Sequence, residues 1–194
     1  VDVGVSLGTD AMGEEKWAGR CTACGKWNGA IAQRLQRHDV HCDMDFYRDW
    51  RRRMWERCTF DAVFHLIGAV RDEATTLADV GLYYENEVSD MVWEVSMSLR
   101  GWKAITLLYG FEQRLSGMAA QPETNMQCMV DESMYPFIWG NRVFTECKMI
   151  SEYMWFAREQ KGLFASCELP PQPSDGEEMK SIMRQGNMRA DGVI

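Results

Sequence analysis

Apolar residues recur every three or four positions in three stretches of the chain. They lie within residues 45–58, 88–99 and 143–154, and polar or charged residues stand between them. A stripe with this spacing covers one face of a helix and leaves the other face to solvent. The pattern therefore predicts three amphipathic helices.

Two other stretches, 60–68 and 104–109, are short and almost continuously apolar. Such runs are typical of strands buried on both faces of a sheet. Residues 110–135 are predicted as a loop. Strands that alternate with helices favour parallel pairing, so the pattern predicts an α/β fold. Shorter strands are expected at 3–7, 40–42 and 163–167.

Length and charge narrow the class of protein. The 194 residues suit one domain of ordinary size. A net charge of -8 argues against a mainly electrostatic nucleic-acid binder, which would carry a basic face. No apolar run approaches the length of a membrane span, and the first residues do not resemble a signal peptide. The seven cysteines are an odd number with scattered spacing, so we expect most to be reduced, in a cytoplasmic protein.

Several segments together resemble one known family. Residues 61–68, 83–88, 103–108 and 139–140 resemble, in the right order, segments of the extended short-chain dehydrogenase/reductase family. Its members include the NAD-dependent nucleotide-sugar epimerases and dehydratases. The resemblance implies a Rossmann-like parallel sheet with helices on both faces over residues 1–168. It also implies that the irregular segment 169–194 is a remnant of a substrate-binding part, in a diverged or truncated relative.

The same resemblance implies a site for NAD or NADP. The family's glycine loop would bring backbone amides to the pyrophosphate. An ordinary strand-to-helix turn competes for that loop, and a loop or cap role competes for the adenine and nicotinamide positions. The implied residues are Gly8, Asp10, Ala11, Met12 and Gly13 in the loop, Asp43 and Met44 at the adenine, Leu66, Ile67 and Gly68 at a strand end, and Asn86 near the nicotinamide.

The catalytic positions of the family hold other residues in this chain. Trp139 stands at the place of the family's tyrosine and Val143 at the place of its lysine. Gly110 falls near the serine position, and Tyr135 is the nearby substitute for the tyrosine. Because indole is no general base and valine carries no charge, the usual proton relay is absent.

Two functions remain open under this resemblance. One is an epimerase or dehydratase, an isomerase or lyase that acts on a nucleotide sugar by reversible hydride transfer to the cofactor. The other is a non-catalytic binding or interaction module on the same fold. The helix stripes within 88–99 and 143–154 would either cover the sheet or form a homodimer interface.

A zinc-containing interaction protein is the third alternative. Tetrahedral zinc is commonly held by two close pairs of cysteine or histidine. The available ligands would be Cys21, Cys24, His38 and either His41 or Cys42. Accidental placement of these residues is the competing interpretation, so no metal is assigned. His65, inside the apolar run 60–68, is interpreted as a core or strand-end histidine rather than as a ligand.

Overall fold

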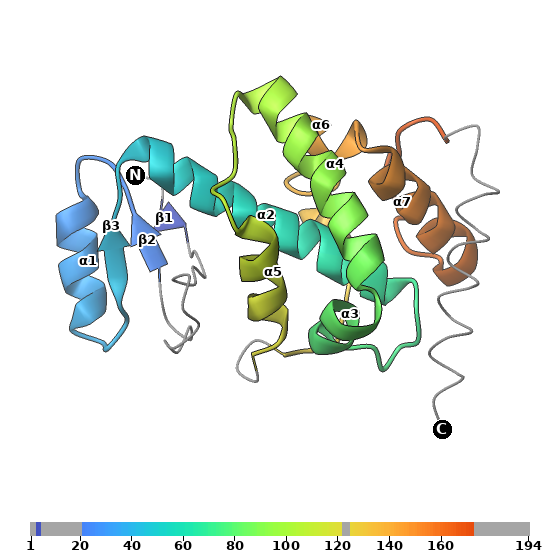
Figure 1. Ribbon diagram of the computed structural model, residues 1–194, viewed down its shortest axis with the longest axis horizontal. Helices are drawn as coiled ribbons and strands as arrows, with labels where there is room; N and C mark the ends of the chain where they lie inside the picture. Colours follow the sequence, from blue (N-terminus) through green and yellow to red (C-terminus); the bar gives the residue numbers. More distant parts are fainter. Residues whose placement is uncertain (1–2, 5–20, 122–124, 173–194) are drawn as a thin grey trace.

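The computed structural model describes residues 3–4, 21–121 and 125–172, and within these ranges the protein is mostly helical. Figure 1 shows a small sheet beside helix α1 (Asn28–Gln36), and the long helix α2 (Tyr47–Ala69) running from there into a body of helices. The remaining elements of that body are α3 (Leu77–Tyr83), α4 (Glu85–Lys103), α5 (Phe111–Ala119), the short 3-10 helix η1 (Glu132–Met134), α6 (Arg142–Thr145) and α7 (Lys148–Lys161).

The sheet has the strand order β1 (Val3–Gly4), β2 (Cys21–Ala23), β3 (Cys42–Met44). Strands β1 and β2 pair antiparallel, whereas β2 and β3 pair parallel. Parallel neighbours need a crossover connection, and α1 supplies it. Its Ala32 packs in a small apolar cluster with cysteines and an alanine of the two strands. The strand predicted at 3–7 is confirmed at Val3–Gly4, and residues 5–7 lie outside the described ranges. The strand predicted at 40–42 is present but shifted to Cys42–Met44.

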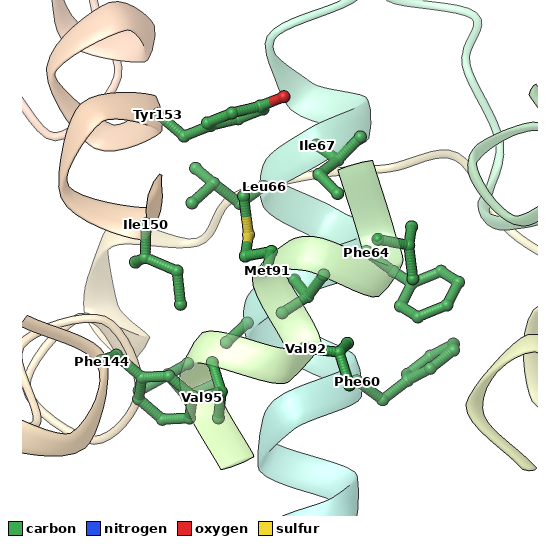
Figure 2. Packing of buried hydrophobic residues seen from close by; sticks show 14 of the residues in the cluster. Phe60, Phe64, Leu66, Ile67, Met91, Val92, Val95, Phe144, Ile150 and Tyr153 are labelled. Carbon is green, nitrogen blue, oxygen red and sulfur yellow. The ribbon is translucent and has the colours of Figure 1, made fainter. Parts of the chain in front are cut away.

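The main core surrounds the second half of α2. Residues such as Phe60, Phe64 and Ile67 of this helix are fully buried. Figure 2 shows Leu66 of α2 on the side of Ile150 and Tyr153 of α7, whereas the rings of Phe60 and Phe64 point away from α6 and α7, with α4 crossing between. The labelled partners from these helices are Met91, Val92, Val95, Phe144, Ile150 and Tyr153.

The prediction of a strand over 60–68 was wrong, because these residues continue α2. Nothing between Cys58 and Gly68 breaks the helix begun at Tyr47, and the whole stretch is surrounded by other helices. A helix that is buried on all sides loses its amphipathic stripe. Its sequence then looks like a strand buried on both faces, and periodicity alone does not separate the two.

The predicted strand at 104–109 is also absent. Ala104 ends α4 in the left-handed conformation (φ 51°), and the next residues form an irregular connection outside the sheet. Ile105 and Leu107 point into the core while Leu108 and Tyr109 are exposed, which reproduces the alternation of a strand without a ladder.

Two further segments differ from expectation. The supposed loop 110–135 contains α5 and η1. Residues 163–167 form turns instead of a strand. Phe164 has a left-handed backbone there (φ 57°), and the Arg158 side chain donates hydrogen bonds to the carbonyls of Phe164 and Cys167.

The predicted α/β fold is thus confirmed only as far as the parallel β2–β3 pair and its crossover helix. The helices expected over 45–58, 88–99 and 143–154 are present, the last as α6 and α7. The apolar stripes of 88–99 and 143–154 lie in the protein's own core, so these two stripes do not offer the homodimer interface considered above. Within the described ranges, no helix combines the length and apolar character that a membrane crossing requires.

Candidate functional site

A buried ionic network lies where three helices meet. Arg71 follows the end of α2, and its guanidinium forms an ion pair with the Glu87 carboxylate in the first turn of α4. The Tyr153 hydroxyl of α7 donates a hydrogen bond to the same carboxylate. The two charged side chains are only 1% and 12% exposed. Both charges are thus removed from water, and each depends on its partners for stabilisation.

Aromatic contact completes this network. The Arg71 guanidinium lies 4.5 Å from the centre of the Tyr84 ring, within the range of a cation–π interaction. Burial, and secondarily the Glu87 carboxylate, raises the pKa of Tyr153 well above its usual value. The phenol therefore stays protonated as a hydrogen-bond donor and does not serve as a general base.

An open pocket of about 770 Å³ lies beside this network. Its size falls in the range of small-molecule sites. The turn after α2, the helix α3 and the C-terminal end of α7 form its walls. They contribute both cationic and acidic groups and three aromatic rings. The lining residues are Val70, Arg71, Asp72, Ala74, Thr75, Asp79, Tyr83, Tyr84, Phe156, Gln160 and Lys161.

Two of the pocket's charges already have structural partners. Arg71 pairs with Glu87, and the Asp79 carboxylate accepts hydrogen bonds from the backbone and hydroxyl of Thr76 at 2.9 and 2.7 Å. This reciprocal capping box begins α3. Lys161 and Asp72 are exposed at the rim. The charge most accessible to an anionic ligand is therefore that of Lys161.

The residues predicted to bind NAD do not converge on this pocket. The loop residues Gly8, Asp10, Ala11, Met12 and Gly13 lie outside the described residues. Asp43 and Met44 are in β3, where the Asp43 carboxylate lies 2.9 Å from His41 Nε2 and accepts a hydrogen bond from Arg53.

Leu66, Ile67 and Gly68 lie in the buried end of α2 instead of at a strand end. Leu66 is 19 residues after Tyr47, which places it about 28 Å further along the helix axis from the sheet. Asn86 is exposed in the first turn of α4. The described cofactor positions are thus spread over distant elements and do not fit one NAD molecule. The cofactor prediction itself stays untested, because the glycine loop is not described.

The positions equated with catalytic residues have structural roles. The Trp139 indole is buried and donates a hydrogen bond to the Ala62 carbonyl at 3.1 Å. Val143 is buried in α6, and its backbone N–H is capped by Asn141. Gly110 precedes α5 with a positive φ of 78°, and the Tyr135 hydroxyl bonds the Glu168 carbonyl.

The proposed zinc ligands are only partly brought together. Cys21 and Cys42 are partners in the β2–β3 register, and Cys24 is buried just after β2. His38 and His41 are exposed. Among the described residues, no group of three or more histidine, cysteine or acidic side chains could hold a metal ion.

His65 is a half-buried histidine of α2 with a structural hydrogen bond. Its Nδ1 accepts a hydrogen bond from the Met129 backbone N–H at 3.3 Å. Burial lowers the pKa of His65 below 6.5, and this effect outweighs the nearby Asp61 carboxylate, which favours the protonated form. The neutral ring is therefore the form that the folded protein accommodates.

We expect this histidine to make the protein less stable in mild acid. The unfolded chain takes up a proton as the pH falls below about 6.5, while the folded state resists it, so stability present above pH 6.5 is lost below it. The contribution of His65 is at most about 1.4 kcal/mol at one pH unit below 6.5. Urea unfolding at pH 7.5 and 5.5 should show a larger loss for the wild type than for His65→Gln. Equal losses would contradict the assignment.

Sequence reasoning missed the residues of this site. Arg71, Glu87 and Tyr153 are far apart in the chain, and the only local signal was a charged residue directly after the apolar run that ends at Val70. No protein-family model matches the chain, and no curated protein or solved structure was found to match it.

Proposed function

We propose that the protein is a non-catalytic binding module whose site is the pocket beside Arg71, and that its ligand is a small anionic molecule with a planar ring, of the nucleotide class. The observation that carries this proposal is the composition of one pocket. A cavity of about 770 Å³ combines aromatic walls with the positive charges of Arg71 and Lys161.

Each part of such a ligand has a matching group. Lys161 ends α7 at the rim, where its ammonium group is accessible to a phosphate. Arg71 contributes positive charge to the lining of the pocket while it remains paired with Glu87. The exposed ring of Tyr83 offers a surface on which a base can stack. The Asp72 carboxylate can accept hydrogen bonds from an amino or hydroxyl group.

Binding is better supported than catalysis at this site. Tyr153 is held protonated by burial, and Asp79 is engaged in the cap of α3. Asp79 lines the pocket and Tyr153 belongs to the network beside it, and the two do not form a pair of nucleophile and base. We therefore assign the pocket residues to recognition.

An NAD-dependent enzyme acting on a nucleotide sugar stays the second candidate. The family resemblance implies it, and the β2–α1–β3 unit, a parallel pair with a helical crossover, is the observation in its favour. A Rossmann-like sheet would have to extend from this unit. Among the described residues, the positions that the resemblance implies for the cofactor do not converge on one surface, so we base the first proposal on the pocket.

Calorimetric titration with AMP, adenosine, inorganic phosphate and NAD tests both candidates. We expect AMP to bind more tightly than adenosine, because only AMP carries the phosphate. Lys161→Gln should weaken AMP binding about tenfold, since hydrogen bonds to charged groups are worth about 1.5–3 kcal/mol. Lys26→Gln removes the same charge from an exposed lysine beside α1 and should leave the affinity unchanged.

The outcomes separate the candidates. No saturable AMP binding, or AMP binding unchanged by Lys161→Gln, would overturn the proposed site. NAD binding that is indifferent to Lys161→Gln and to Tyr83→Leu would favour the enzyme hypothesis and a site elsewhere on the chain.

A further inference from the structure

Two cysteines face one another across the parallel strands. Cys21 begins β2 and Cys42 begins β3, and the two residues are direct partners in the ladder. Neighbouring strands lie about 4.8 Å apart. Disulfides form between residues whose Cα atoms are about 4.4–6.8 Å apart. The backbone therefore already holds these residues at a spacing that a disulfide accepts.

The side chains share one face of the sheet. Parallel partners project to the same side, and both cysteines pack in the same small cluster under α1. Both are reduced and almost fully buried. Burial, followed by a hydrogen bond with the Cys21 thiol, raises the pKa of Cys42 to about 12. The ladder register and the shared cluster thus place the two side chains together, and no large backbone movement is needed to join them.

We propose that Cys21 and Cys42 are a redox-sensitive pair that forms a disulfide on reaction with glutathione disulfide. This site is separate from the Arg71 pocket and does not depend on the function proposed for it. The third cysteine of the region, Cys24, lies beyond the end of β2 and outside the β2–β3 ladder.

The reaction balances as ordinary thiol–disulfide exchange. The Cys21 thiolate attacks one sulfur of glutathione disulfide and expels a glutathione thiolate, leaving a mixed disulfide on Cys21. The Cys42 sulfur then attacks the Cys21 sulfur, loses its proton to solvent and expels the second glutathione. The protein loses two electrons and two protons, and glutathione disulfide becomes two molecules of glutathione.

The disulfide would link the two parallel strands of the small β2–α1–β3 unit. The β2–β3 ladder is only three residues long, and α1 lies within the segment between the two cysteines. Joining Cys21 to Cys42 closes this segment into a covalent loop. A proteolytic cut within α1 would then leave the two pieces attached until a reductant is added.

Thiol counting on the full chain tests the proposal. The reduced protein has seven thiols and should retain five after incubation with glutathione disulfide and removal of excess reagent. Trypsin digestion of the oxidised protein should yield peptide 21–26 linked to peptide 38–48. Cys24→Ser is the matched control, because it keeps the proposed pair and should also lose two thiols.

The variants decide which sulfur atoms react. Cys42→Ser and Cys42→Ala, checked for native circular dichroism, should lose no pair of thiols. A wild type that keeps seven thiols would overturn the proposal. So would a Cys24→Ser variant that loses none, or Cys42 variants that still lose two, since each result places the reactive pair elsewhere.

Discussion

Replacing Gly68 by alanine should destabilise the protein by about 3 kcal/mol, at the upper end for an overpacked core. Gly68 lies near the end of α2, in close contact with the side chain of Cys128. A Cβ atom at Gly68 would lie 2.2 Å from the Cys128 sulfur and 2.4 Å from its Cβ. Because Cys128 is itself buried, neither residue can move aside without shifting backbone. Urea unfolding monitored by circular dichroism measures the loss.

Two comparisons isolate the clash. Gly101 is also within a helix, but a Cβ there meets nothing within 4 Å. Gly101→Ala should therefore stabilise the protein by about 0.5–1 kcal/mol through helix propensity alone. Changing Cys128 to glycine in the Gly68→Ala background should recover part of the lost stability. A Gly68→Ala protein as stable as the wild type would show that the contact is wrongly described.

Neutralising Glu87 should cost about 3 kcal/mol or more. Glu87→Gln keeps the size of the side chain but removes the negative charge that faces the buried Arg71 guanidinium. Removing one partner of a buried ion pair typically costs about 3–5 kcal/mol, because the other charge stays desolvated. The amide can still accept a hydrogen bond from Tyr153, which places the expected cost at the lower end of this range.

The same substitution at an exposed pair provides the control. Glu146 accepts a bond from Arg142 one helical turn away, and these side chains are 47% and 62% exposed. Exposed pairs of this spacing contribute about 0.3–0.5 kcal/mol, so Glu146→Gln should change stability by less than half a kilocalorie. Equal effects of Glu87→Gln and Glu146→Gln in chemical denaturation would contradict the importance of the buried network.

The sequence predicted those helices that have one polar face. The stripe Val88, Val92, Val95 and Leu99 faces the core in α4, and charged residues between them face solvent. The amino-acid sequence alone shows this contrast between apolar and charged positions. In the second half of α2 it disappears, because other helices surround residues such as Phe60 and Phe64. Because other helices surround this part of α2, its sequence is almost continuously apolar and resembles that of a buried strand.

The candidate site depended on contacts that no local pattern contains. Arg71 and Glu87 are 16 positions apart, and Tyr153 and Glu87 are 66 apart. Their meeting requires α2, α4 and α7 to be packed together first. The resemblance, by contrast, matched short apolar segments such as 61–68, and these occur in buried helices as readily as in buried strands. The strand that the resemblance implies for that segment is therefore wrong.

Because the protein has two separate apolar clusters, we expect amide hydrogens in the two regions to exchange through different opening motions. Five residues near the middle of α2 have no exposed surface, so exchange of their amide hydrogens with water requires the helical body to open as a whole. They are Ala62, Val63, Phe64, Leu66 and Ile67. The cluster under α1 is much smaller and is held by a ladder of three residues. Its amides can exchange through a local opening that leaves α2 protected, so the chain divides into one slowly exchanging unit and one that opens on its own.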